Sequence, residues 1–140
     1  MTVAKIMSKS VVTIEPNRLI ADVAALLSER RIGAALVTSV EGKVAGIISE
    51  RDVVRAIARE GAAALDKPVA SCMTRNVVTC NPGTLITQVM AMMTEGKFRH
   101  VPVIEGDRLV GIVSIGDVVK RRLADFEAES AAMRDYIASA

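Results

Sequence analysis

The stretch Gly46-Ile47-Ile48-Ser49-Glu50-Arg51-Asp52 returns later in the chain as Gly111-Ile112-Val113-Ser114-Ile115-Gly116-Asp117. The segment Val11-Val12-Thr13-Ile14-Glu15-Pro16 likewise returns as Val77-Val78-Thr79-Cys80-Asn81-Pro82, at an offset of 66 residues against 65 for the first pair. Because the segments keep their order, the chain contains one long repeat in two copies. A unit this small must stack on its neighbour to bury a core. We therefore predict one folded unit made of two similar halves.

The composition is typical of a globular protein and disfavours several classes of function. Of the 140 residues, 51% are hydrophobic and 24% are charged, and the formal net charge is +2. Basic residues occur in short runs, and Phe98, Phe126 and Tyr136 are too few to form a base-stacking surface, so we expect no nucleic-acid partner. No apolar run approaches the roughly 20 residues that span a bilayer, and Met1-Thr2-Val3-Ala4-Lys5 opens no signal peptide. We expect a cytoplasmic protein without membrane contact.

The sequence gives little support to metal binding or catalysis. Cys72 and Cys80 are too far apart for a CxxC motif, and His100 is the single histidine. A structural zinc site needs about four such ligands, and a nucleophilic enzyme needs a base beside its nucleophile. We therefore expect two thiols in a reducing compartment, no metal site and no enzyme.

Each half contains the same order of predicted elements. Residues 11–14 form a short β-branched run that Pro16 ends, and the i, i+3, i+4, i+7 spacing of Ile20, Val23, Ala24 and Leu27 predicts an amphipathic helix. The second half repeats this spacing from residue 86, with Thr84 as the predicted N-cap and Arg18 in its place in the first half. Strands over 34–38, 44–48, 100–104 and 109–114 follow, and a second helix begins after Ser49 and after Ser114. This order predicts an α/β fold with two small sheets.

The last helix is longer than its counterpart in the first half. No helix breaker occurs between Gly116 and about residue 138, and a 4, 3, 4, 3, 4 spacing forms a heptad seam of Val119, Leu123, Phe126, Ser130, Met133 and Ile137. Such a helix is longer than a small domain can cover, which favours a homodimer formed through it. The alternatives are a helix that folds back onto its own domain or one that frays after Glu129.

The doubled motif has a structural and a functional interpretation. Ser at the end of a strand with Asp three residues later is a variant of the helix capping box, and this explains Ser49 with Asp52 or Ser114 with Asp117 without any ligand. The preceding glycine, however, allows another group to approach the strand, and the first turn of a helix attracts anions. A carboxylate there can also accept two hydrogen bonds from a vicinal diol. Phosphate and ribose together would describe a nucleotide.

Over about residues 3–125, the chain resembles the cystathionine-β-synthase-domain (CBS) family, as a tandem pair called a Bateman module. The resemblance rests on Val11-Val12-Thr13 with Pro16, on His100-Val101-Pro102-Val103, and on the two Gly-x-x-Ser-x-x-Asp endings. It implies two β-α-β-β-α repeats packed about a pseudo-two-fold axis, with residues 1–66 as the first repeat with its lead-in and connector, 67–122 as the second, and 123–140 as a helical extension. It also implies two clefts that hold AMP, ADP, ATP, S-adenosylmethionine or NAD(H) as regulatory ligands, with no catalytic cofactor.

Carried over by position, the resemblance implies a set of ligand-binding residues. Asp52 and Asp117 would bind ribose, and Ser49 and Ser114 would face phosphate. Arg51, Arg99 and His100 would be cationic phosphate contacts, although Arg51 could equally be a solvated helix residue and His100 a strand residue bonded to backbone. The adenine pockets would be lined by Thr13, Ile14, Ala35 and Ile48 in the first copy and by Thr79, Cys80, Val101, Pro102 and Val113 in the second.

The two copies differ around the motif, which predicts two unequal sites. The first copy has Gly33-Ala34-Ala35-Leu36 where the second has Arg99-His100-Val101-Pro102, whereas Arg51 is replaced by Gly116. We therefore assign Arg51 to one site and Arg99 with His100 to the other. The leading hypothesis is a non-catalytic sensor that binds an adenine nucleotide and passes its occupancy to a protein partner or dimer interface. The alternative is a dimerisation or scaffold protein with ligand-free clefts.

Overall fold

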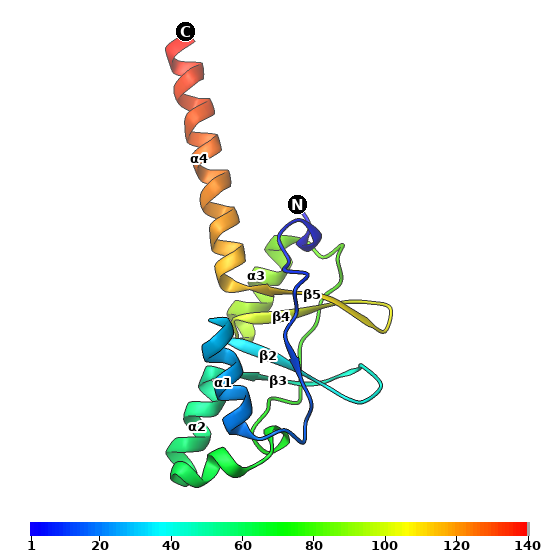
Figure 1. The fold of residues 1–140 in the computed structure, drawn as a ribbon. Coiled ribbons are helices and arrows are strands. Elements are labelled where there is room, and N and C mark those ends of the chain that lie inside the picture. The colour runs from blue at the N-terminus through cyan, green and yellow to red at the C-terminus, as the bar shows by residue number, and fades with distance from the viewer. Residues whose placement is uncertain (140) are drawn as a thin grey trace.

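Two α/β repeats and one projecting helix make up the computed structural model, which describes residues 1–139 (Figure 1). The first repeat contains β1 (Thr13–Ile14), α1 (Ile20–Arg30), β2 (Ala34–Thr38), β3 (Val44–Ser49) and α2 (Glu50–Glu60). The second contains α3 (Ile86–Gly96), β4 (His100–Glu105), β5 (Arg108–Ser114) and α4 (Ile115–Ser139). Short 3-10 turns occupy Val3–Lys5, Gly61–Asp66 and Val69–Ser71. The predicted α/β order is confirmed in both halves.

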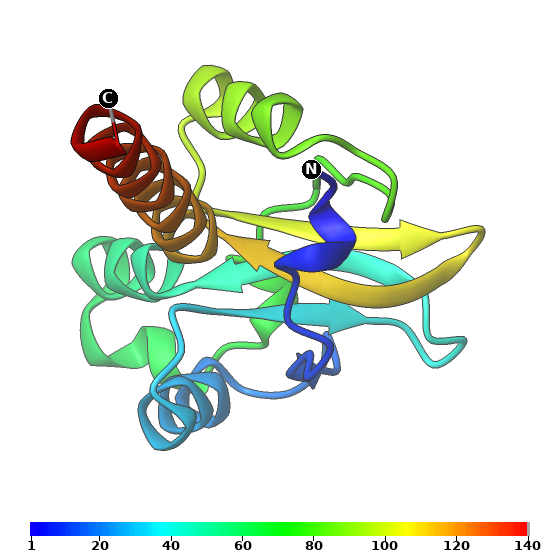
Figure 2. The same cartoon turned by 90° about the horizontal axis from the view of Figure 1, so that it is seen from above.

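The two sheets share an antiparallel pair, but the first has three strands and the second has two. In the first sheet, β1 runs parallel to β2 and β2 runs antiparallel to β3. In the second, β4 and β5 are antiparallel, and Cys80 forms a single parallel bridge with Val103 where the first repeat pairs Ile14 with Val37. Figure 2 shows the two sheets lying side by side with the helices around them. The pseudo-symmetry of the sequence is therefore a symmetry of the fold.

The first strand is shorter than the prediction over residues 11–14, because β1 contains only Thr13 and Ile14. Ser8, five residues earlier, forms a bridge with Ile112 in the other repeat, with backbone hydrogen bonds of 2.9 and 3.0 Å. Residues 9–12 must therefore cross from one sheet to the other. This crossing leaves too few residues for a longer strand.

Helix α1 and its counterpart α3 bury the predicted stripes. Ile20, Val23 and Leu27 of α1 belong to the core of the first repeat. Ile86, Val89 and Met93 of α3 belong to the core of the second. Each helix presents one apolar face to its sheet, as the 3.6-residue period requires.

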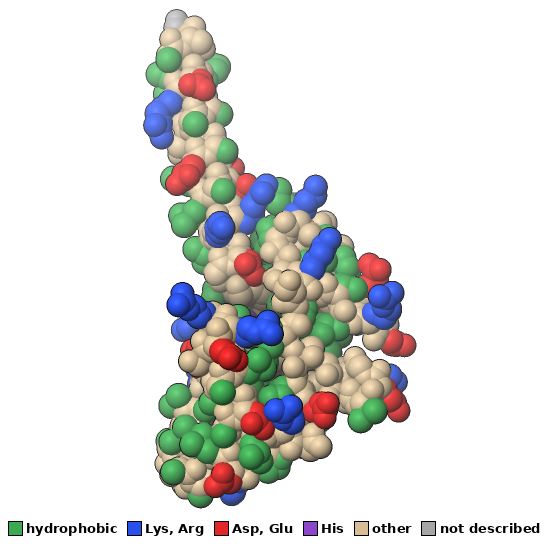
Figure 3. Space-filling view, viewed as in Figure 1, with side chains coloured by type: hydrophobic (Ala, Val, Ile, Leu, Met, Phe, Trp, Pro, Cys, Tyr) green, Lys and Arg blue, Asp and Glu red, His purple; other side chains and the backbone are tan. Residues whose placement is uncertain are grey.

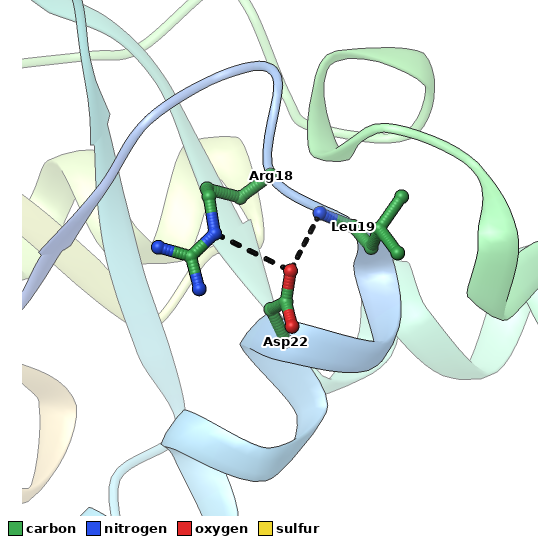
Figure 4. A network of polar contacts seen from close by, with 3 residues as sticks. All are labelled: Arg18, Leu19 and Asp22. Carbon is green, nitrogen blue, oxygen red and sulfur yellow. Dashed lines mark hydrogen bonds and ion pairs between the residues drawn. The ribbon is translucent and has the colours of Figure 1, made fainter.

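The starts of these two helices differ from the prediction by one residue. The N-caps are Leu19 and Leu85, not Arg18 and Thr84. At the start of α1, the Asp22 carboxylate accepts from the Leu19 N–H at 3.0 Å and from Arg18 Nε at 3.3 Å (Figure 4). At the start of α3, Gln88 Oε1 accepts from the Leu85 N–H at 2.9 Å. A leucine can serve here because the N3 side chain reaches back to the N-cap N–H, as in one half of a capping box. Thr84 instead accepts from the Asn81 N–H in the preceding turn.

The lead-in segments of the two repeats are exchanged. Val3 is completely buried in the core of the second repeat, whereas Val69, its counterpart, is completely buried in the core of the first. Thr74 pairs with Ile47 in the first sheet in the same way as Ser8 pairs with Ile112 in the second. Each repeat is thus completed by the segment that precedes the other, which explains why the halves form one unit.

The doubled glycines make this exchange possible. A Cβ atom on Gly46 would lie 2.7 Å from the Thr74 carbonyl oxygen, and one on Gly111 would lie 2.9 Å from the Ser8 carbonyl oxygen. Met73 and Met7 also contact these positions from the same crossing segments. The group that approaches the strand at each glycine is therefore the chain itself, which corrects the expectation that the glycine makes room for a ligand.

Helix α4 leaves the body of the protein along most of its length (Figure 1). Its 25 residues include one fully buried side chain near the start, Val118, and residues 131–139 are all exposed. The predicted extent of this helix is confirmed. Among residues 1–139, no helix combines the length and the apolar character needed to cross a membrane. The cytoplasmic location stays a prediction.

Candidate functional site

The two Ser/Asp pairs form closely similar capping boxes at the starts of α2 and α4. Asp52 Oδ2 accepts from the Ser49 N–H at 2.9 Å and from the Ser49 hydroxyl at 3.0 Å. Asp117 Oδ2 accepts from the same groups of Ser114, both at 2.9 Å. Each serine oxygen in turn accepts from the N–H of its aspartate, at 3.3 and 3.2 Å. The structural interpretation of the motif is therefore confirmed in both copies.

The second carboxylate oxygen distinguishes the two copies. Asp52 Oδ1 accepts a long bond of 3.4 Å from the Thr74 hydroxyl, which comes from the crossing segment. Within residues 1–139, Asp117 Oδ1 has no hydrogen-bond partner, although Ser8 occupies the position that corresponds to Thr74. Both aspartates are half-buried. One oxygen of each thus stabilises its helix, and the other remains able to accept a bond from a ligand.

A hollow of about 350 Å³ lies where the two repeats meet, near the starts of α2 and α4. Its lining comes from the start of α2, the start of α4, the end of α3 and the segment that joins α3 to β4. The lining residues are Arg51, Met93, Thr94, Lys97, Phe98, Arg99 and Ile115. Its size falls at the lower end of small-molecule sites. Arg51 and Arg99, which we assigned to different copies, therefore line one hollow.

Three cationic side chains, Arg51, Lys97 and Arg99, surround this hollow and are all exposed. Within residues 1–139, no carboxylate lies within ion-pair distance of any of them. The first turns of two helices, where partial positive charge accumulates, lie beside them. The hollow therefore combines the features that attract a phosphate or another anion.

Sequence reasoning missed Lys97, although it stands two residues before Arg99 in the segment Lys97-Phe98-Arg99. Lys97 is the C-cap of α3 and has a positive φ of 55°, so it turns the chain directly before Phe98 and Arg99. The Lys97-Phe98-Arg99 segment places two cations on either side of a half-buried aromatic ring. Ile115 and Thr74 were also missed, because a contact between repeats leaves no periodic signal in the sequence.

His100 lies against the other repeat. A Cβ atom on Gly33 would be 3.4 Å from its Cε1 atom, so the glycine gives the imidazole room. Burial lowers the pKa of His100 below its usual 6.5, with Asp117 opposing this shift and Arg99 reinforcing it. Burial therefore disfavours the protonated ring, and the role of His100 as a cationic phosphate contact stays a prediction. The imidazole could still donate one hydrogen bond from its neutral form.

The predicted adenine-lining residues are divided between the two cores. Ile14, Ala35 and Ile48 pack together in the first core, and Cys80, Val101 and Val113 pack together in the second. Pro102 is also buried, whereas Thr13 and Thr79 are exposed. The buried members hold the strands in place, so a ligand would meet strand edges and backbone beside them.

A larger hollow lies elsewhere on the first repeat, between β1, α1 and the end of β2. Its volume is about 680 Å³, and its lining includes Thr13, Ile14, Arg18, Asp22 and Ser39. Arg18 and Asp22 form an ion pair with each other at 3.3 Å, and both side chains are largely exposed. Neither hollow is lined by a member of a Ser/Asp pair, and the larger one includes the predicted adenine-lining residues Thr13 and Ile14. Of the predicted site residues, only Arg51 and Arg99 line the smaller hollow, so its cations alone favour it as a phosphate site.

The described residues offer no metal centre. Within residues 1–139, no three His, Cys, Asp or Glu side chains lie close enough together to hold a metal ion. Burial raises the pKa of both Cys72 and Cys80, and Asp52 adds to the shift of Cys72. Both therefore remain protonated thiols near neutral pH.

Two α/β repeats with exchanged lead-ins, each followed by a capped helix near a shared hollow, define a paired α/β module. The CBS domain family model matches this chain twice, over residues 3–59 and 69–124. The chain therefore belongs to the CBS-domain family and carries a tandem pair, a non-catalytic module. The resemblance proposed from the sequence is confirmed.

Three proteins illustrate the relationship. The CBS-domain containing protein ATU1752 from Agrobacterium tumefaciens is 47% identical, with a TM-score of 0.84 over 86% of this chain and 92% of that one. The CBS domain pair of protein MJ0100, solved with 5′-methylthioadenosine and S-adenosyl-L-methionine, is 28% identical, with a TM-score of 0.83 over 89% and 98%. The mitochondrial CBSX3 protein of Arabidopsis thaliana is 33% identical over 115 residues, which are 79% of this chain but 56% of that protein. A CBS pair of this fold thus binds adenosyl compounds.

Proposed function

We propose that this protein is a regulatory module that binds an adenine nucleotide between its two repeats and passes the occupancy to a protein partner or a dimer interface. The observation that carries the proposal is the hollow lined by Arg51, Lys97 and Arg99, three cations without an ion-pair partner among residues 1–139. An anionic ligand would supply the missing countercharge. The adenosyl ligands of the related MJ0100 pair support the choice of an adenine compound.

The charge of the hollow favours phosphate-bearing ligands. AMP, ADP, ATP and NAD(H) carry negative phosphates, whereas S-adenosylmethionine carries a positive sulfonium. Guanidinium groups bind phosphate oxygens through two parallel hydrogen bonds. We therefore expect this module to prefer a nucleotide to the ligands of its relative.

The aspartates can bind ribose without giving up their caps. Oδ2 of Asp52 and of Asp117 accepts from the serine N–H, so Oδ1 is the oxygen that the cap does not use. A ribose diol would donate to it, with Ser49 or Ser114 beside the phosphate. Asp117 would lose no hydrogen bond of the described residues, whereas Asp52 would exchange the long bond from Thr74 for one from the ribose. The second copy is thus the stronger candidate.

Ligand binding at this place can reach the rest of the molecule through two helices. Arg51 and Ile115 lie in the first turns of α2 and α4, so a ligand that contacts both couples the repeats. A ligand shifts an equilibrium only by its difference in affinity between two arrangements. The starts of α2 and α4 are the elements whose arrangement the ligand would bias.

One observation favours a second function, that of a scaffold with ligand-free clefts. The Ser/Asp pairs form helix caps in both copies, so their presence in the sequence needs no ligand. In that case the cations at the hollow would contact solvent only, and no adenine compound would bind.

Calorimetry on the purified protein separates the two functions. We expect AMP and ATP to bind, and Asp117→Asn to weaken binding by roughly 10- to 100-fold, the worth of a charge-assisted bond at about 1.5–3 kcal/mol. Arg99→Ala should weaken AMP and ATP binding but should not weaken binding of S-adenosylmethionine. Arg30→Ala, an exposed arginine at the end of α1, is the matched control and should leave affinity unchanged. Absence of any adenine-compound binding would favour the scaffold.

A further inference from the structure

We propose that α4 pairs with α4 of a second copy of this chain as a parallel two-stranded coiled coil. The inference goes beyond the nucleotide site and does not depend on it. It rests on an unpartnered apolar seam and on the order of charges beside that seam. Both features lie on α4, whose projecting part carries hydrophobic and charged side chains (Figure 3).

The apolar side chains of the seam are exposed, and Ser130 between them is half-buried. Val119 and Leu123 are 48% and 57% exposed, and Phe126, Met133 and Ile137 are 60–66% exposed. Isolated apolar side chains are common on surfaces, but a continuous row of them marks an interaction site. A row with alternating spacings of four and three residues fits a second helix, because it stays on one face of a supercoiled pair.

The spacing fixes the heptad positions. Val119, Phe126 and Met133 take position d, and Leu123, Ser130 and Ile137 take position a. The flanking e positions are then Lys120, Glu127 and Arg134, and the flanking g positions include Arg122 and Glu129. These flanking charges decide how two such helices orient.

In a parallel pair, each g residue lies beside the e residue five positions later in the partner. Arg122 then meets Glu127 of the second copy, and Glu129 meets Arg134. The two-fold axis doubles both contacts, so four attractive pairs flank a seam that is buried along its whole length. Such pairs each contribute little, but they set partner choice and orientation.

An antiparallel pair cannot combine complete burial of the seam with attractive charges beside it. With the whole seam overlapped, Glu127 would face Glu127 of the second copy and Glu129 would face Glu129. A slip of one heptad that brings Lys120 beside Glu127 leaves Met133 and Ile137 uncovered. The parallel arrangement alone combines complete burial of the seam with attraction at its flanks.

Disulfide trapping tests the orientation directly. In helices about 8–10 Å apart, facing Cα atoms lie within reach of a disulfide, so Leu123→Cys and Met133→Cys should each form a homodimer under oxidation. In the full antiparallel overlap, both pairs would be about 15 Å apart at about 1.5 Å per residue. A one-heptad slip would separate one of them by about 25 Å. Trapping at only one position, or at neither, overturns the proposal.

The outward-facing Ala128 provides the matched control. It takes position f, on the side of α4 opposite the seam, and is exposed. Ala128→Cys should not form the disulfide. Since Cys72 and Cys80 are present in every variant, the same control reports any background from the native thiols.

Charge exchange provides a second, independent test by sedimentation equilibrium of the full chain at low salt. Arg122→Glu and Glu127→Arg should each weaken the dimer about tenfold, because each turns two attractive pairs into repulsive ones. The double variant should recover the wild-type dissociation constant. In the slipped antiparallel pair, Lys120 faces Glu127 and Arg122 faces Glu129. The double variant would make both of these contacts repulsive, so it would weaken that pair more than either single variant. A wild-type chain that stays monomeric at all concentrations also overturns the proposal.

Discussion

Substituting Gly46 by alanine probes the exchange of lead-ins between the repeats. The added Cβ would lie 2.7 Å from the Thr74 carbonyl oxygen and 2.9 Å from Met73 Sδ. The first of these contacts is with backbone, which cannot swing away as a side chain can. The crossing segment must therefore move, and the two hydrogen bonds between Ile47 and Thr74, at 2.8 and 2.9 Å, are strained or lost.

The size of the effect follows from three contributions. Overpacking costs about 1–3 kcal/mol, and weakening two backbone hydrogen bonds adds about 1 kcal/mol. Alanine also lowers the conformational entropy of the unfolded chain, which stabilises the folded protein by about 0.4–1 kcal/mol. The net loss is about 2 kcal/mol, which lowers the Tm of a chain this long by roughly 4–8 °C.

Thermal unfolding followed by circular dichroism measures this loss, with Gly116→Ala as the control. Gly116 lies in the first turn of α4, and a Cβ there would meet nothing closer than Ser114 Oγ at 3.6 Å. Alanine is the better helix former by about 0.5–1 kcal/mol, so this variant should melt slightly higher than the wild type. An unchanged Tm for Gly46→Ala would refute the close crossing of the lead-in.

Two further predictions concern buried titratable groups. Burial lowers the pKa of His100, so the unfolded chain binds a proton more readily than the folded chain. The stability that the neutral imidazole contributes is therefore complete above about pH 6.5. It is lost as the pH falls below that value. Chemical denaturation between pH 7.5 and 5.5 should therefore show a smaller loss of stability for His100→Gln than for the wild type, and equal losses would contradict the burial of the imidazole. Because burial raises the pKa of Cys80, a Cys72→Ser variant should react with a thiol reagent at pH 7.5 much more slowly when folded than when unfolded. Equal rates would show that the Cys80 thiol is accessible in the folded protein.

Much of the fold could be predicted from the sequence because its signals are local. The stripe on α1 depends only on the helical period, and the second half repeats it. The strand from 34 to 38 was predicted with its observed bounds, since turn residues flank an apolar run. The repeat itself then predicted two similar small sheets, and the structure has a three-stranded and a two-stranded sheet, because the predicted first strand of the second half is reduced to one bridge at Cys80.

Contacts between the repeats could not be predicted in this way. Gly46 and Gly111 suggested a close approach, but the sequence does not show that the approaching group is the preceding segment of the chain. Arg51 and Arg99 were assigned to different copies because they belong to different repeats, yet the packing brings both to one hollow. The charge of His100 depends on its burial against Gly33, which is likewise a property of the assembled pair.

Native mass spectrometry of the protein, as purified and after addition of millimolar AMP, ATP or S-adenosylmethionine, tests the central claim most directly. We predict at least one adenine nucleotide bound per chain, with AMP or ATP displacing S-adenosylmethionine because of the cations at the hollow. The Asp52→Asn, Asp117→Asn double variant should lose most of this occupancy while remaining folded. A wild-type chain whose mass shows no adenine compound under any of these conditions would contradict the account.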